Sequence, residues 1–205
     1  MEAPTLEREW ALWEKGHEVV AGIDEVGRGP LAGPVIAAAV VFLPGQLPIQ
    51  GLRDSKLLSQ RQRERMVSVV KSQALTWAIG AASVKEIDKL NIRRATALAM
   101  RRALAHIPFL PDHVLIDGNP VPELGTPHEA IVKGDRTCQS IAAASVIAQC
   151  LRDRLMTTLA RRDPHVSWEK NKGYGTAAHL SALEEFGPTK HHRQTFSPVA
   201  QGRLF

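Results

Sequence analysis

The chain has 205 residues, and its 44% hydrophobic and 23% charged residues are typical of a globular protein rather than a disordered or fibrous one. The longest apolar run, 35–43, is far shorter than the roughly 20 residues of a membrane-spanning helix. The acidic start of the chain does not resemble a signal peptide. We therefore expect a cytoplasmic, monomeric protein with no membrane partner.

The net charge of +5 is concentrated near the C-terminus. Residues 151–205 hold nine Lys and Arg against five Asp and Glu, so this stretch alone carries +4. We interpret residues 151–205 as a basic flank that contacts phosphates of a polyanion, and we assign His191 and His192 to it. The two cysteines, Cys138 and Cys150, lack metal-ligand spacing and are predicted to be small core residues without a disulfide.

Apolar runs and turn signals predict five strands in chain order. The predicted strands cover 19–23, 35–42, 77–82, 114–116 and 129–132. Predicted helices begin at Ser59, run from Ser83 towards 107, and cover about 137–162 and 176–186. This order predicts an α/β fold with a mixed five-stranded sheet, flanked by helices and followed by a C-terminal helical segment.

Carboxylates follow three of these strands: Asp24 with Glu25, Asp117, and Asp135. Ligands gather at strand ends in open α/β sheets, so these acids could converge on one cleft. Clustered acids repel one another unless a cation is present, and Mg²⁺ or Mn²⁺ prefers carboxylate oxygens. Because neighbouring strand residues point to opposite faces, we expect Asp24 and Glu25 to share a site only if their strand ends there. The alternative is that each acid is a solvated loop residue.

A glycine-rich stretch, Gly27-Arg28-Gly29, follows the first pair of acids. The glycines suit a close approach of the backbone to a ligand, and Arg28 could pair with a phosphate. A dinucleotide-binding loop is disfavoured because two carboxylates would face the phosphates and Pro30 obstructs a helix start. A purely structural turn is the alternative.

Together these residues resemble bacterial ribonuclease HII, the type 2 ribonuclease H family. The similar segments are GIDEVGRGPLAG (22–33), DSKLLS (54–59), EIDKLNI (86–92), LIDGN (115–119), VKGD (132–135), SIAAAS (140–145), RDR (152–154) and KGYGT (172–176). The resemblance spans roughly 20–199 and implies a ribonuclease H-like fold. It also implies an endonuclease that cuts RNA–DNA hybrids and single ribonucleotides embedded in duplex DNA, with a role in removing them.

The resemblance also implies which residues act. The implied set is Asp24, Glu25, Asp117 and Asp135 for catalysis and for two Mg²⁺ or Mn²⁺ ions, with Gly27, Arg28, Gly29, Lys56, Lys172 and Tyr174 for the substrate. Backbone groups of the glycine-rich stretch would read the 2′-hydroxyl, which distinguishes RNA from DNA. Two-metal catalysis 5′ of the ribonucleotide would leave 3′-hydroxyl and 5′-phosphate ends. Without the resemblance, Tyr174 is a packing residue and Lys56 a solvated lysine.

One domain is predicted over 1–205, with a core over about 18–160, a C-terminal segment that contacts substrate over about 161–199, and a tail over 200–205. The tail residues Gln201, Leu204 and Phe205 fit the pattern of peptides that bind the sliding clamp, and packing on the domain is the alternative. Two positions depart from the family's usual pattern: Arg136 replaces a small residue and Gln149 replaces a common Lys. They put affinity or packing in doubt rather than activity.

Two other functions compete with a ribonuclease. A non-catalytic nucleic-acid-binding module of the same fold is disfavoured because clustered carboxylates would repel phosphates without any benefit to binding. A metal-dependent hydrolase of a small phosphate substrate is disfavoured because the glycine-rich stretch, Tyr174 and the basic flank suit a polyanion.

Overall fold

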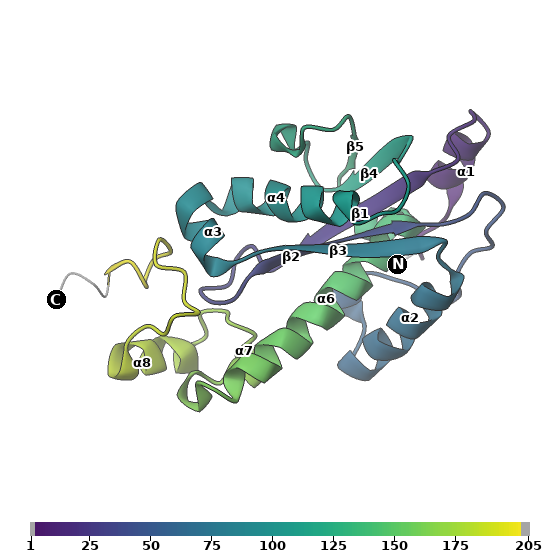
Figure 1. Ribbon diagram of the computed structural model, residues 1–205. Helices are drawn as coiled ribbons and strands as arrows, with labels where there is room; N and C mark the ends of the chain where they lie inside the picture. The colour runs from purple at the N-terminus through teal and green to yellow at the C-terminus, as the bar shows by residue number, and fades with distance from the viewer. Residues whose placement is uncertain (1–2, 202–205) are drawn as a thin grey trace.

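The computed structural model describes residues 3–201, and a mixed five-stranded sheet lies between helices on both of its faces (Figure 1). The strands are β1 (Val20–Val26), β2 (Val35–Val41), β3 (Thr76–Ala82), β4 (His113–Asp117) and β5 (Glu129–Ile131). Their order in the sheet is β3-β2-β1-β4-β5. β2 runs antiparallel to β1 and β3, whereas β1, β4 and β5 are parallel. The predicted mixed sheet of five strands is confirmed.

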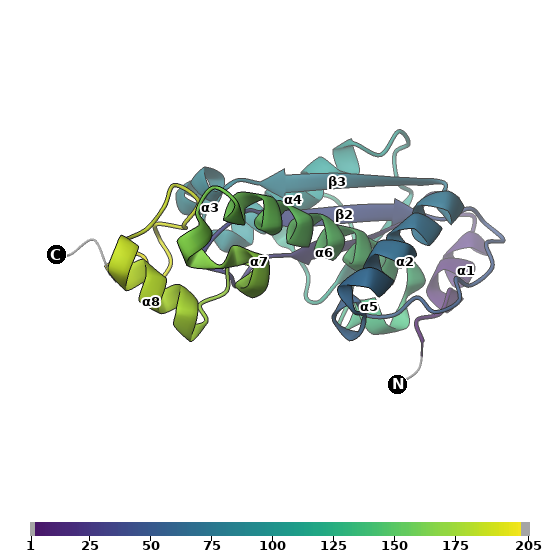
Figure 2. The same cartoon turned by 90° about the horizontal axis from the view of Figure 1, so that it is seen from below.

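Helices cover the sheet in two layers, as Figure 2 shows from below. The helices are α1 (Glu7–Trp13), α2 (Gln60–Gln73), α3 (Val84–Leu90), α4 (Ile92–Ala105), α5 (Gly134–Thr137), α6 (Gln139–Ala160), α7 (Trp168–Asn171) and α8 (Ala177–Phe186), with short 3₁₀ turns at Ser55–Leu57, Pro122–Leu124 and Pro164–Val166. α4 packs on one face, while α6 and α2 lie on the other. None of the helices over residues 3–201 is both long and apolar enough to span a membrane.

The predicted helix starts at Ser59 and Ser83 are confirmed, since each serine forms a reciprocal capping box with the residue three positions later. The helix predicted from Ser83 towards 107 is instead two helices, α3 and α4. Asn91 separates them with a φ of 69°, and its side-chain oxygen accepts a hydrogen bond from the Arg94 N–H at 3.1 Å. Asn91 therefore ends one helix and caps the next.

Small residues allow the helices to approach the sheet closely. A Cβ placed on Gly22 of β1 would lie 2.2 Å from Ser140 Oγ at the start of α6. On the other face, a Cβ on Gly80 of β3 would lie 2.0 Å from the Ala99 carbonyl oxygen of α4. Each glycine therefore sets the distance between one helix layer and the sheet.

β1 is longer than predicted. It was expected to end at Ile23, but it continues through Asp24 and Glu25 to Val26. β2 pairs with β1 up to Val26, whereas the pairing with β4 stops at Ile23. The last residues of β1 therefore have a neighbouring strand on one side only, and the two acids lie at an open edge.

The C-terminal segment (161–199) lies beyond one end of the sheet, at the opposite end of the molecule from α1 (Figures 1 and 2). Backbone hydrogen bonds fasten it to residues 31–33. The Leu31 N–H donates to the Gly173 carbonyl at 2.8 Å, and the Gly33 N–H donates to the His191 carbonyl at 2.9 Å. A buried cluster around Trp168 gives the segment an apolar core.

Three residues of the predicted basic flank are buried instead. Arg152, His192 and Arg193 have no exposed surface, so the prediction that the basic flank contacts phosphates is wrong for these three residues. Cys138 and Cys150 are buried free thiols, as predicted.

A hydrogen-bond chain explains the burial of His192. Its Nδ1 accepts from the Thr189 N–H at 2.9 Å, so its proton lies on Nε2, 3.0 Å from His179 Nε2. His179 Nε2 also accepts a hydrogen bond from Trp168 Nε1, and His179 Nδ1 donates to the Tyr174 carbonyl. Both imidazoles are neutral in this arrangement. Burial, and secondarily His179, lowers the pKa of His192 to about 4.

We expect this burial to make folding sensitive to acid. Below the ordinary histidine pKa of 6.5 the unfolded chain binds a proton at His192 that the folded chain does not bind until about pH 4, so stability falls as the pH falls through this window. Urea unfolding at pH 7.0 and 4.5 should show that the wild type loses about 2–3 kcal/mol more than His192→Gln. If the wild type and His192→Gln lose the same free energy of unfolding, His192 is not the cause of the acid sensitivity.

Candidate active site

A cleft of about 180 Å³ opens at the end of β1 and collects most of the predicted site residues. Its lining residues are Asp24, Glu25, Val26, Gly27, Arg28, Gly29, Ser55, Lys56, Ser145, Gln149 and Tyr174. Two predicted acids, the glycine-rich stretch, one predicted lysine and the single tyrosine of the chain thus share one hollow. They come from three separate parts of the sequence, 24–29, 56 and 174.

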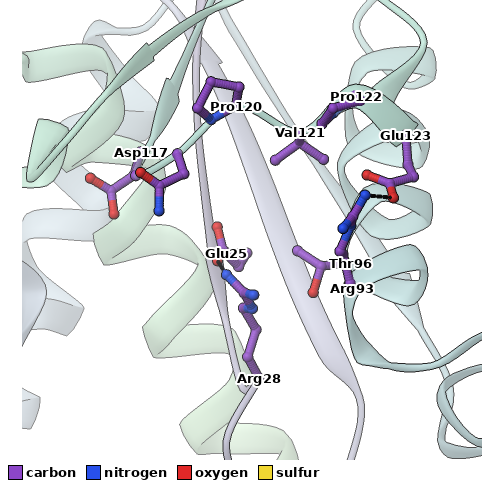
Figure 3. Close-up of a pocket in the computed structure, with 11 residues that line it drawn as sticks. Glu25, Arg28, Arg93, Thr96, Asp117, Pro120, Val121, Pro122 and Glu123 are labelled. Atoms are coloured by element: carbon purple, nitrogen blue, oxygen red, sulfur yellow. Dashed lines mark hydrogen bonds and ion pairs between the residues drawn. The ribbon is translucent and has the colours of Figure 1, made fainter.

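A second cleft, of about 470 Å³, adjoins the first (Figure 3). Glu25 and Arg28 line both clefts, which therefore meet at the open edge of β1. Asp117, at the end of β4, lines the second cleft on the same side as Glu25, and an ion pair between Arg93 and Glu123 forms the facing wall.

Asp24 and Glu25 interact although they occupy consecutive positions in a continuing strand. Burial raises the pKa of Asp24 well above its usual range, the charge of Glu25 adds to this rise, and a hydrogen bond from Ser145 opposes it. Burial also raises the pKa of Glu25. The Arg28 guanidinium, whose Nη1 lies 3.1 Å from Glu25 Oε1, opposes this rise. Both acids line one cleft, and β1 ends at Val26, one residue after Glu25, so they share this cleft close to a strand end.

Asp117 connects the first pair of acids to Asp135. Its charge contributes to the raised pKa of Asp24 and of Glu25, and its Oδ1 accepts the Asp135 N–H at 3.3 Å. Burial, followed by the charge of Asp117, raises the pKa of Asp135 as well. Gly134 permits this approach, since a Cβ there would lie 2.7 Å from Ile141 Cδ1 and 3.5 Å from Asp117 Oδ1.

These four acids offer hard oxygen donors, which is the chemistry that Mg²⁺ and Mn²⁺ require. Burial is the main cause of the raised pKa values of Asp24, Glu25 and Asp135, and the charges of neighbouring acids add to it, so a bound divalent cation would stabilise the ionised carboxylates. Across residues 3–201, however, no three Asp, Glu, His or Cys side chains are spaced to hold one ion. The structure thus brings the donors together as an interacting group without a formed coordination sphere.

Asp54 is a site residue that the sequence analysis missed. It is buried, its Oδ1 accepts the Lys56 N–H at 2.9 Å, and its charge contributes to the raised pKa of Asp135. Arg136, one of the two departures from the family pattern, donates from Nε to Asp54 Oδ2 at 3.2 Å. The only sequence signal was the position of Asp54 at the head of the 54–59 segment.

The remaining predicted substrate residues differ in their surroundings. Tyr174 is 49% exposed, and its ring lies 3.7 Å from the place where a Cβ of Gly29 would be. Lys56 is exposed, with its ammonium 4.0 Å from Asp135 Oδ2. Lys172 lines neither cleft, and its Nζ donates to Thr157 Oγ1 at 3.0 Å.

The other two sequence-based predictions concern Gln149 and the tail. Gln149, the second departure from the family pattern, lines the first cleft and donates to Asp153 at 2.8 Å. Gln201 is exposed, whereas Leu204 and Phe205 lie outside the described residues. Clamp binding by the tail stays a prediction.

Comparison with known proteins places this geometry in context. A model of the ribonuclease HII family matches residues 21–199. A curated protein called ribonuclease HII from Ruegeria pomeroyi is 52% identical over 200 residues, which cover 97% of this chain and 85% of that protein.

Two solved structures share the fold. The ribonuclease H2 from Pyrococcus horikoshii has a TM-score of 0.74 at 23% identity, with coverage of 90% of this chain and 96% of that one. A complex of Bst-RNase HIII with Mn²⁺ has a TM-score of 0.72 at 18% identity, with coverage of 91% and 70%. These likenesses confirm the expected ribonuclease H-like fold.

Proposed function

Because the chain belongs to the ribonuclease HII family and is a type 2 endoribonuclease H, we propose that it hydrolyses the phosphodiester bond 5′ of ribonucleotides. The substrates are RNA–DNA hybrids and single ribonucleotides embedded in duplex DNA, and the products carry 3′-hydroxyl and 5′-phosphate ends. The role of the reaction is removal of ribonucleotides from DNA. The observation that carries the proposal is that one cleft holds Asp24 and Glu25 beside the glycine-rich stretch and Tyr174.

We assign the binding of Mg²⁺ or Mn²⁺ to Asp24, Glu25, Asp117 and Asp135. Their oxygen donors and the mutual effect of their charges on the pKa values of Asp24 and Asp135 support this assignment, as does the Mn²⁺ complex of the structurally similar Bst-RNase HIII. Divalent ions bound there supply an activated water and stabilise the departing 3′ oxygen.

The protein's own groups position the substrate around these acids. The exposed Arg28 guanidinium is held by Glu25 at the junction of the two clefts, where it can pair with a phosphate. The ammonium of Lys56 lies near Asp135 and can offset the charge of a second phosphate. The exposed ring of Tyr174 beside Gly29 offers a flat apolar surface to a sugar.

The test uses a DNA duplex with one central ribonucleotide, incubated with Mg²⁺ or Mn²⁺. We expect a nick on the 5′ side of the ribonucleotide, no cleavage of the same duplex made entirely of DNA, and loss of the nick when a chelator is added. An intact ribonucleotide duplex in the presence of metal would overturn the proposed function. A nick that persists in the chelator would overturn the metal assignment alone.

A further inference from the structure

The side chain of Arg193 lies beneath the glycine-rich stretch and donates hydrogen bonds to its backbone carbonyls. Its guanidinium has no exposed surface, although 165 residues separate it from Arg28. Nη1 donates to the Arg28 carbonyl at 2.8 Å, Nη2 donates to the Gly27 carbonyl, and Nε donates to the Gly33 carbonyl at 3.0 Å. The side chain also stacks on the ring of Phe196, 4.9 Å from its centroid. One planar cation thus binds three carbonyl oxygens of a single loop.

No carboxylate of residues 3–201 forms an ion pair with Arg193. A buried charge without an ion-pair partner is costly to a protein, and backbone carbonyls are the hydrogen-bond acceptors that compensate it here. A neutral side chain could fill the same space without that cost. The hydrogen bonds of the Arg193 guanidinium therefore do more than fill space. They fix the orientation of the peptide groups whose carbonyls they bind.

A trans peptide group places its C=O and its N–H on opposite sides of the chain. By holding the carbonyls of Gly27 and Arg28 inward, Arg193 turns the N–H groups of Arg28 and Gly29 outward. Both of these residues are exposed. Within the part of the chain that the structure describes, neither N–H has a hydrogen-bond acceptor. Both N–H groups are therefore directed away from the Arg193 guanidinium, and Arg28 and Gly29 line the cleft that also contains Tyr174, Asp24 and Glu25.

We infer that Arg193 is a positioning residue that sets the direction of the Arg28 and Gly29 N–H groups, and thereby the preference of the cleft for a ribonucleotide. The inference rests on the proposed function, because it takes these N–H groups to be the donors that meet the ribonucleotide and its phosphate. The preference of the cleft for a ribonucleotide over a deoxyribonucleotide then depends on a buried side chain that does not contact the substrate.

The test compares Arg193→Lys with the wild type. Lysine keeps the charge but has no planar fork, so it cannot hold the three carbonyls together. Steady-state cleavage gives kcat and KM for the single-ribonucleotide duplex, and an all-DNA duplex of the same sequence serves as a competitive inhibitor. Arg102→Lys is the matched control, since Arg102 donates to the Ala81 carbonyl at 2.7 Å, away from both clefts.

For Arg193→Lys we expect kcat/KM for the ribonucleotide duplex to fall at least about tenfold, while the inhibition constant of the all-DNA duplex stays within about twofold. Arg102→Lys should change neither. If Arg193→Lys keeps the wild-type kcat/KM, or weakens both duplexes equally, the inference is overturned. A wild type that does not discriminate between the two duplexes would instead overturn the proposed function.

A second measurement needs no variant and applies even if Arg193→Lys does not fold. Amide hydrogen exchange of the wild type should show fast exchange at Arg28 and Gly29 in the free protein. The ribonucleotide duplex should slow this exchange more than the all-DNA duplex does. Equal protection by both duplexes, or slow exchange in the free protein, would contradict the inference.

Discussion

Asp117→Asn is expected to lower the rate of ribonucleotide-dependent cleavage by about a thousandfold or more, equivalent to about 4 kcal/mol of activation free energy. The charge of Asp117 acts on Asp24, Glu25 and Asp135, so it is the one acid that interacts with all the others. Asparagine keeps the size of the side chain and can still accept the Asp135 N–H. The substitution therefore removes the charge of Asp117 and one of the oxygens proposed to bind metal, with little change in shape.

Single-turnover cleavage at saturating Mg²⁺ or Mn²⁺ measures this effect. Asp112→Asn is the control, because Asp112 lies outside both clefts and accepts the Val19 N–H at 2.8 Å, which asparagine can also do. Without divalent ions, Asp117→Asn should be at least as stable as the wild type, since it relieves repulsion among buried acids. A cleavage rate close to that of the wild type would remove Asp117 from the site.

Gly80→Ala should lower the free energy of unfolding by about 3 kcal/mol. The new Cβ would lie 2.0 Å from the Ala99 carbonyl oxygen and 2.4 Å from the Ala103 nitrogen. Both are backbone atoms of α4, so the whole helix must move. Because α4 carries Arg93 and Thr96 to the wall of the second cleft, the movement should also change the site.

Urea unfolding at neutral pH tests the prediction for Gly80→Ala. Gly45→Ala is the comparison, because a Cβ on Gly45 meets nothing within 4 Å and only its φ of +83° is unfavourable. That strain should cost about 1 kcal/mol. Equal losses in the two variants would show that α4 adjusts without cost to the extra methyl group.

Local patterns in the sequence predict the elements whose stability is local. The apolar run of β2, the helix start at Ser59 and the capping box at Ser83 depend on neighbouring residues, and these predictions are correct. The break at Asn91 was missed because the apolar periodicity continues through α3 and α4, and only the left-handed backbone at Asn91 separates the two helices. The extra length of β1 was missed because it depends on pairing with β2.

The candidate site divides in the same way. The acids and the glycine-rich stretch are recognisable as motifs, and the structure brings Asp24 and Glu25 together with that stretch and Tyr174. Composition counts charges without showing burial, so Arg193 was assigned to a basic flank that contacts phosphates, although it is buried. Its partners lie about 160 residues earlier in the chain, and only the tertiary fold shows that a cation lies beneath the loop.

The hydrogen bonds between residues 31–33 and the C-terminal segment have a consequence for engineering. Residues 31–33 and the residues after 172 lie side by side, and each segment supplies backbone hydrogen-bond partners to the other. A chimaera that takes only its C-terminal segment from a relative would pair that segment with residues 31–33 of a different protein. Exchange of 27–34 along with 161–199 should preserve these hydrogen bonds, so the smallest unit that can be transferred intact is discontinuous in sequence.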